Sequence, residues 1–233
     1  MKNIEWQDDR DIYGRMLLLT DSYLFTGLRN AVDNYDADLT HALTWGQLKS
    51  KRWLISELEK LDIDLGTIFI CAGWYAILAG MLFESKCKIT KIRSFDVDKL
   101  STDIADTINR KYVVDGWKFK ALEKDIHELV YDKFSWTFWS TKNNRMSYPI
   151  IDTANTIINT SCEHIVDFDR WYRNIPNYTL VILQSNDYTG IDEHVNCVSS
   201  IEQFKTQTPM SKEIFTGEMK LAKYTRFMRL GYK

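Results

Sequence analysis

Runs of consecutive apolar residues alternate along this chain with segments in which apolar residues recur at helical spacing. The clearest helical segment is residues 45–61, where residues 53–55 and Leu58 recur on one face between Lys, Ser and Glu. Residues 62–66 interrupt that pattern, and a continuous β-rich run at residues 67–71 follows. Such apolar runs are typical of strands buried on both faces of a parallel sheet.

The same alternation continues to the C-terminus. It predicts helices over residues 74–84, 100–112 and 168–173, and strands over residues 89–95, 117–122, 156–159 and 178–184. Two alternating runs, residues 213–221 and 224–231, predict an antiparallel pair at the edge of the sheet. Residues 131–149 have no clean period and predict a loop or a short helical turn. The pattern as a whole predicts an α/β fold with a mostly parallel seven-stranded sheet, helices on both faces and a C-terminal antiparallel hairpin.

The length and the scarcity of breakers predict a single domain. The chain has 233 residues with only three prolines and ten glycines, so a Pro/Gly-rich linker between two domains is absent. We expect residues 1–44 to form a helical cover that precedes a core of residues 45–233. The aromatic residues of that region suit a lid over the strand ends: Tyr13, Tyr23, Phe25, Tyr35 and, next to it, Trp45.

The charge balance argues against a general affinity for nucleic acid. Thirty basic residues stand against 32 acidic ones, for a formal net charge of −2, which gives no overall attraction to phosphate backbones. Four basic residues near the C-terminus could form a local patch, although a solvated strand face is the simpler interpretation: Lys220, Lys223, Arg226 and Arg229.

Cysteine usage and the N-terminal sequence predict a cytoplasmic protein. The four cysteines lie far apart without a CxxC pair, so neither a disulfide framework nor a zinc site is expected, and we predict no metal site. The first residues are polar and charged rather than a secretory signal, and no run of eighteen apolar residues occurs, so we expect no membrane span.

Four groups of residues follow predicted strands, where open parallel sheets bind ligands. Gly73 permits a tight turn after the first strand, a role that can also be purely structural. Asp96 follows the second strand and could accept ribose hydroxyls, whereas the nearby Asp98 suits a helix cap. Asp125 follows the third strand and could accept a hydrogen bond from an adenine amino group. The alternative is that Asp125 is a solvated acid in a loop.

The densest group of polar residues is residues 159–164, directly after the fourth strand. Glu163 or His164 could serve as a general base, because burial can tune either toward neutral pH. We expect one of the two to face the reacting atoms and favour His164 as the residue that anchors the loop. Cys162 lacks the partners of a cysteine hydrolase. The alternative is that the segment only caps the next helix.

Residues 45–233 contain, in order, a helix, a glycine turn after the first strand, an acid after the second strand, an acid after the third, a polar segment after the fourth and a terminal antiparallel hairpin. In this order the chain resembles the Rossmann-like class I S-adenosylmethionine-dependent methyltransferases. The resemblance implies S-adenosylmethionine as cofactor and a methyl acceptor, which we expect to be a small molecule. It implies that Ala72, Gly73 and Trp74 hold the methionine part of the cofactor. It also implies that Asp96 and Val97 bind the ribose, that Asp125 and Ile126 meet the adenine, and that residues 159–164 face the methyl group. Of these, Asn159 and Thr160 would touch the cofactor, and Glu163 and His164 would be catalytic.

The chain departs from that family at several positions. Cys71 stands where the family has an acid before its first glycine, and Tyr75 stands where a second glycine is usual. The segment after the fourth strand lacks the Asn/Asp-Pro-Pro-Tyr signature of enzymes that methylate nucleic-acid amino groups. Two alternatives therefore stay open: an aminocarboxypropyl transfer from the same cofactor, as in nicotianamine synthase-like enzymes, and a non-catalytic Rossmann-like module. The sequence predicts neither the acceptor nor the oligomeric state.

Overall fold

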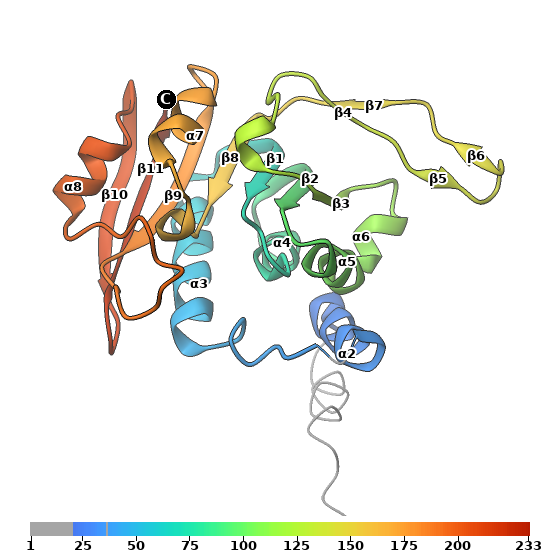
Figure 1. Ribbon diagram of the computed structural model, residues 1–233, viewed down its shortest axis with the longest axis horizontal. Coiled ribbons are helices and arrows are strands. Elements are labelled where there is room, and N and C mark those ends of the chain that lie inside the picture. Colours follow the sequence, from blue (N-terminus) through green and yellow to red (C-terminus); the bar gives the residue numbers. More distant parts are fainter. Residues whose placement is uncertain (1–20, 36) are drawn as a thin grey trace, which may run out of the picture.

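The computed structural model describes residues 21–35 and 37–233, and its centre is one seven-stranded sheet (Figure 1). The strand order is β10-β11-β9-β8-β1-β2-β3. The strands are β1 (Asp64–Cys71), β2 (Lys88–Asp96), β3 (Phe119–Glu123), β8 (Thr156–Asn159), β9 (Leu180–Asn186), β10 (Lys212–Lys220) and β11 (Thr225–Tyr232). All pairings are parallel except those of β11 with its two neighbours. The expected mostly parallel sheet is confirmed.

Alternate residues of each central strand fill two different cores. Ile68 and Ile70 of β1 pack with apolar residues of α3 (Trp45–Leu61), α4 (Ile77–Phe83) and α5 (Lys99–Ile108) on one face of the sheet. Phe69 and Cys71 point to the other face, toward α7 (Phe168–Asn174) and α8 (Ile201–Gln207). A strand covered on both sides buries every residue, which explains the continuous apolar runs of the sequence.

Local signals set the helix boundaries. The predicted bounds of α3 are confirmed: the Thr44 side chain accepts a hydrogen bond from the Gln47 N–H, and Asp62 ends the helix in the left-handed conformation. The helix predicted over residues 100–112 is instead divided into α5 and α6 (Arg110–Val114). Asn109 separates them, and its side-chain amide donates to the carbonyls of Ala105 and Ala76.

Residues 131–149 were expected to form a loop or helical turn, and this prediction is wrong. The segment forms most of a β-arm that projects from the body of the molecule (Figure 1). Its strands pair as β4 (Phe134–Trp136) with β7 (Ile150–Asp152), and as β5 (Trp139–Ser140) with β6 (Arg145–Met146). The buried Asp152 carboxylate holds the base of the arm, because it accepts hydrogen bonds from three side chains: Trp136, Arg93 and Lys91.

The C-terminal antiparallel pair is confirmed, but its inner strand is not exposed. β10 forms the edge of the sheet, and β11 lies between β10 and β9. Arg226 and Arg229 on β11 are therefore buried, and they pair with Glu163 and Glu213. The expectation of a solvated strand face or a basic patch is wrong for these two residues. Helix α8, which the sequence analysis did not predict, packs beside them.

The described part of the N-terminal region packs in part on other helices. Helix α2 (Tyr23–Tyr35) packs against α4 and α5, and a Cβ at Gly27 would lie 1.8 Å from the Ile108 carbonyl oxygen. Tyr13 lies outside the described residues. Ala42, in the described part of the expected cover, lines the cavity discussed below, and the lid over the strand ends stays a prediction.

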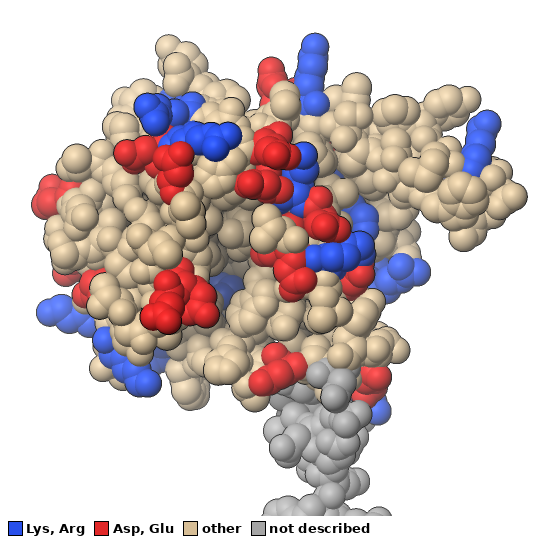
Figure 2. All heavy atoms as spheres, in the orientation of Figure 1, with Lys and Arg blue, Asp and Glu red and all other residues tan. Residues whose placement is uncertain are grey.

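The face of the molecule drawn in Figure 2 carries charges of both signs. Lys and Arg side chains are interspersed with Asp and Glu on the face drawn in Figure 2. Among residues 21–35 and 37–233, no helix combines the length and apolar character needed to cross a membrane.

Candidate active site at the carboxyl ends of the strands

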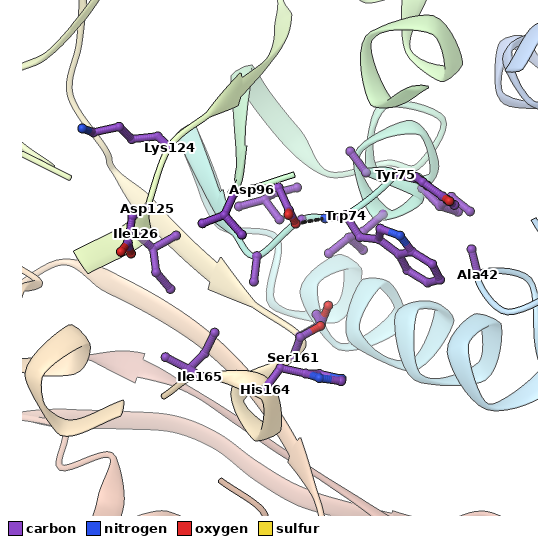
Figure 3. Close-up of a pocket in the computed structure, with 18 of the residues that line it drawn as sticks. Ala42, Trp74, Tyr75, Asp96, Lys124, Asp125, Ile126, Ser161, His164 and Ile165 are labelled. Atoms are coloured by element: carbon purple, nitrogen blue, oxygen red, sulfur yellow. Dashed lines mark hydrogen bonds between the residues drawn. The ribbon is translucent and has the colours of Figure 1, made fainter. Parts of the chain in front are cut away.

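A cavity of about 530 Å³ opens at the carboxyl ends of β1, β2, β3 and β8 (Figure 3). The chain order reverses between β1 and β8, since β2 and β3 lie on one side and β9 on the other. Crossovers run in opposite directions from such a point and leave a crevice there. The residues that line it after the four strands include Ala72, Gly73, Trp74, Asp96, Val97, Asp125, Ile126, Thr160, Ser161 and His164.

The turn after β1 packs directly on β2. The Gly73 N–H donates to the Phe95 carbonyl at 2.9 Å, and a Cβ at Gly73 would lie 2.0 Å from the Ser94 Oγ. Three residues around it adopt the left-handed conformation without being glycine: Ala72, Trp74 and Ala76 have φ angles of 53°, 49° and 49°. Each such residue costs about 1–2 kcal/mol. Strain of this kind is held by surrounding contacts and concentrates at functional sites.

Asp96 forms one of those contacts. Its Oδ2 accepts a hydrogen bond from the Trp74 N–H at 2.8 Å, and its Oδ1 accepts from the Asp98 N–H at 3.2 Å. Asp98 caps α5 by accepting from the N–H groups of Leu100 and Ser101. The cap is therefore Asp98, as expected, and the Asp96 carboxylate faces the cavity with remaining lone pairs.

Asp125 and Ile126 close the opposite end of the cavity. Asp125 precedes the short helix η1 (Ile126–Glu128) and accepts from the backbone N–H and the ring Nδ1 of His127, both at 2.9 Å. The hydrogen bond from the His127 backbone is the main cause that lowers the pKa of Asp125 below its ordinary value. The side chain of Ile126 is buried and supplies an apolar wall.

The segment after β8 divides into residues that line the cavity and residues behind it. Thr160, Ser161 and His164 line it, whereas Asn159 and Glu163 do not. The buried Asn159 fixes the turn by accepting from the Ser161 N–H at 2.8 Å. Glu163, in the short helix η2 (Cys162–His164), is buried with its Oε1 2.8 Å from the Arg226 Nη1.

Two titratable groups of this segment respond to burial. Burial lowers the pKa of His164 below its ordinary value, which favours the neutral imidazole. Burial also raises the pKa of the Cys162 thiol well above its ordinary value. Because the thiolate is the nucleophilic form, this environment argues against a catalytic Cys162.

Sequence analysis missed several residues that line the cavity. Ala42, Gln47 and Lys51 precede β1, whereas Tyr75, Lys124 and His127 follow β1 and β3. Lys51 is the most distinctive. Burial and the nearby charge of Arg226 lower its pKa to about 7. A signal was present, because Lys51 precedes Leu54, Ile55 and Leu58 at the spacing of one helix face, where a charged residue is unusual.

No protein-family model and no curated protein sequence matches the chain, but solved structures resemble it. The N-methyltransferase NodS from Bradyrhizobium japonicum WM9, in complex with S-adenosyl-L-homocysteine, superimposes with a TM-score of 0.59 at 8% identity, over 91% of this chain and 99% of NodS. Magnesium protoporphyrin IX methyltransferase (ChlM) from Synechocystis PCC 6803, with S-adenosylmethionine bound, gives 0.56 at 11% identity over 97% of each chain.

The chain has the fold of the class I S-adenosylmethionine-dependent methyltransferases. A geranyl diphosphate methyltransferase in complex with geranyl diphosphate and sinefungin gives a TM-score of 0.54 at 8% identity, over 80% of this chain and 77% of that one. Identities this low make the chain a divergent example of the methyltransferase fold.

Proposed function

We propose that this protein is an S-adenosylmethionine-dependent methyltransferase with a small-molecule acceptor. The observation that carries the proposal is the convergence of Gly73, Asp96 and Asp125, from three successive strands, on one cavity at the reversal of strand order. The cavity volume of about 530 Å³ lies in the range of small-molecule sites, about 300–1,000 Å³. Structural neighbours crystallised with S-adenosylmethionine or S-adenosylhomocysteine support the cofactor.

The cofactor would lie along the row of strand ends. Its methionine part would contact Ala72, Gly73 and Trp74, and its ribose would bind Asp96 beside Val97. The adenine would stack on Ile126 and donate a hydrogen bond from its amino group to Asp125. Trp74, Asp96 and Asp125 lie in this order from right to left in Figure 3. Thr160 would lie near the sulfonium, whereas Asn159, behind the cavity wall, would act by holding the turn that carries Thr160.

The reaction needs alignment more than covalent chemistry. A nucleophilic atom of the acceptor forms a bond to the methyl carbon while the carbon–sulfur bond breaks. The sulfur keeps that electron pair as the neutral thioether of S-adenosylhomocysteine. A proton on the acceptor leaves to a nearby base or to solvent.

The geometry favours His164 over Glu163 as the group that faces the acceptor. His164 lines the cavity, and Glu163 is buried behind it in an ion pair with Arg226. This is the reverse of the roles that we expected from the sequence. In the proposed enzyme, Glu163 positions the segment and His164 contacts the acceptor.

Isothermal titration with S-adenosylhomocysteine and with NAD tests the cofactor. We expect micromolar binding of S-adenosylhomocysteine, about −7 to −8 kcal/mol, and none of NAD. Lack of binding to S-adenosylhomocysteine would contradict the proposal and favour a non-catalytic module.

To test the reaction, the protein is incubated with S-adenosylmethionine and a panel of small-molecule acceptors, and the products are separated by chromatography. Formation of S-adenosylhomocysteine supports methyl transfer. Formation of methylthioadenosine instead would indicate an aminocarboxypropyl transfer.

A further inference from the structure

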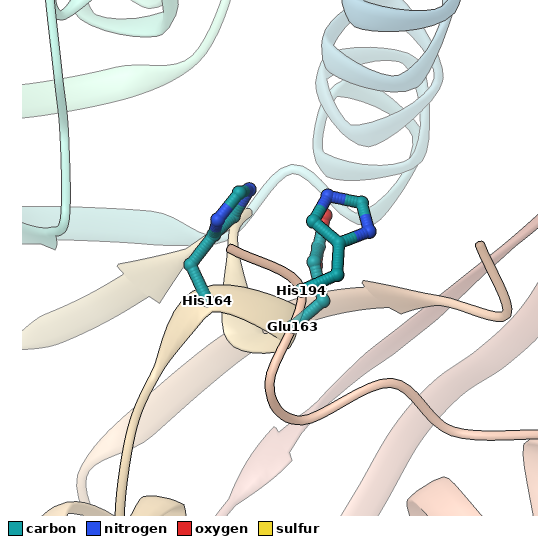
Figure 4. Close-up of side chains that lie close together, drawn as sticks. All are labelled: Glu163, His164 and His194. Atoms are coloured by element: carbon teal, nitrogen blue, oxygen red, sulfur yellow. The ribbon is translucent and has the colours of Figure 1, made fainter. Parts of the chain in front are cut away.

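Three potential metal ligands converge beside the proposed acceptor side of the cavity (Figure 4). They are Glu163 and His164, on η2, and His194, in the segment that joins β9 to α8. One donor atom of each lies within 4.8 Å of the donor atoms of the other two. The two imidazole rings are edge to face, with centroids 4.5 Å apart. Segments about thirty residues apart in the sequence thus bring two nitrogens and one carboxylate oxygen together.

One oxygen of the Glu163 carboxylate has no hydrogen-bond partner in the part of the chain that the structure describes. Arg226 and Asn186 both donate to its Oε1, at 2.8 Å and 2.5 Å. Its Oε2 is buried and receives no hydrogen bond from residues 21–35 and 37–233. A buried, charged oxygen without a donor is costly. A cation at this position would interact with Oε2. Arg226 donates its hydrogen bond to Oε1, so Oε2 remains available to bind the cation.

His194 is oriented as a metal-binding histidine is. Its Nδ1 is hydrogen-bonded to the backbone carbonyl of Tyr188. A carbonyl can only accept, so Nδ1 carries the proton and the lone pair is on Nε2. A backbone carbonyl on the far nitrogen is the usual device that fixes the tautomer and ring orientation of a ligating histidine. Neighbouring residues desolvate part of the His164 ring, but the residue as a whole is exposed at the cavity, which leaves room for the ring to rotate toward a shared ion.

We propose that Glu163, His164 and His194 form a binding site for a divalent transition-metal ion of the zinc type. Two imidazoles and one carboxylate suit zinc or cobalt, whereas magnesium prefers an all-oxygen set. Bonds of about 2.0–2.2 Å require the three donors to move closer, which rotation of the exposed His164 allows. Three protein ligands leave coordination positions open to water or substrate, the pattern of a catalytic rather than a structural site. The sequence analysis expected no metal site because it considered cysteine spacing.

The position of the site suggests what the ion would do, and this part rests on the proposed function. His164 belongs both to the cluster and to the wall of the cavity. An ion held there would contact an oxygen or nitrogen atom of the acceptor and lower its pKa, and the released proton would go to solvent. The acceptor class is then a small molecule whose methylated atom, or an atom next to it, is a metal-coordinating oxygen or nitrogen.

The test is a titration of the metal-free, tag-free chain with Co²⁺, followed by visible absorption, and with Zn²⁺ by calorimetry. We expect one ion per chain, d–d bands of a low-symmetry cobalt site, and displacement of Co²⁺ by Zn²⁺ but not by Mg²⁺. His194→Ala and His164→Ala should each weaken binding at least tenfold. His41→Ala, which removes an exposed histidine outside the cluster, should bind as the wild type does.

Circular dichroism should show that the variants fold. Equal Co²⁺ affinity for the wild type, His164→Ala and His194→Ala would overturn the metal site. Measuring S-adenosylhomocysteine binding by the same proteins separates this outcome from failure of the proposed function. If the wild type binds Co²⁺ through the cluster but does not bind S-adenosylhomocysteine, the metal site stands and the proposed methyltransferase function is contradicted.

Discussion

The carboxylate of Asp96 accepts a hydrogen bond from the backbone N–H of Trp74 at 2.8 Å, across the turn that follows β1. Trp74 is in the left-handed conformation, with φ of 49°. The acid after β2 therefore helps to hold a strained turn after β1, and it presents its remaining lone pairs to the cavity. One side chain thus connects the backbone geometry of the turn with the ribose contact that we propose.

Replacing Asp96 should weaken cofactor binding specifically. In Asp96→Ala, S-adenosylhomocysteine affinity should fall by about 1.5–3 kcal/mol, because charge-assisted hydrogen bonds to the ribose are lost. Calorimetric titration measures this. The matched control is Asp98→Ala, which removes the cap of α5. The control should lower the free energy of unfolding by about 1 kcal/mol and leave the affinity unchanged. Equal affinity for Asp96→Ala and the wild type would remove Asp96 from the ribose role.

A side chain at position 73 should disturb the packing of the turn on β2. A Cβ there would lie 2.0 Å from the Ser94 Oγ and 3.3 Å from the Ile70 Cγ2. We expect Gly73→Ala to lower the free energy of unfolding in urea by about 1–3 kcal/mol, the usual scale of overpacking. The double variant with Ser94→Ala, which removes the nearest atom, should recover part of that loss. No recovery would mean that the backbone, rather than Ser94, resists the substitution.

The base of the β-arm should make stability depend on pH. Burial raises the pKa of Asp152, but hydrogen bonds from Lys91, Trp136 and Arg93 outweigh it, and the pKa lies below its ordinary value of 3.8. The native state thus binds a proton less readily than the unfolded state. The stabilisation is fully present above about pH 4 and is lost as the pH falls through the folded pKa.

Asp152→Asn tests that linkage. At pH 7 it should lower the free energy of unfolding by about 3 kcal/mol, because it leaves the buried Arg93 without a charged partner. The difference between the variant and the wild type should shrink below pH 4, as measured by urea denaturation at several pH values. A difference that stays constant down to pH 2 would exclude the Asp152 carboxylate as its source.

Much of the fold was predictable because its signals are local. The period of α3 and the apolar runs of β1, β8 and β9 reflect burial that each segment experiences along its whole length. The β-arm has strands of only two or three residues, too short for any period to appear. Its anchor on the body also depends on Asp152 meeting Arg93, a contact between residues far apart in the sequence.

The candidate site was predictable only where it follows strands. Residues after parallel strands share one edge of the sheet, so Gly73, Asp96 and Asp125 could be placed together. Lys51 and His194 come from a helix and from a connecting segment whose positions depend on tertiary packing. The buried ion pair of Glu163 could not be predicted, because its partner Arg226 is on β11, which was expected at an exposed edge.

The partly exposed Lys51, whose ammonium group is desolvated by its neighbours, gives the last prediction. Burial of the ammonium, with the nearby positive charge of Arg226, lowers its pKa to about 7, although Glu163 opposes this shift. A lysine in an unfolded chain has a pKa of about 10.4. Between these two values the unfolded state holds a proton that the native state lacks, so the stability of the wild type should rise with pH over that range. Below pH 7 the native state keeps a charged, poorly solvated ammonium.

Lys51→Met should therefore stabilise the protein under acidic conditions. We expect a gain of about 1–3 kcal/mol in the free energy of unfolding at pH 6, and a smaller gain at pH 9, where the wild-type amine is already neutral. Lys49→Met is the matched control, since Lys49 is exposed on the same helix and carries the same charge. Its difference from the wild type should not change between pH 6 and pH 9. If the two variants behave alike, Lys51 titrates as a surface lysine does, and the positively charged form faces the cavity throughout this pH range.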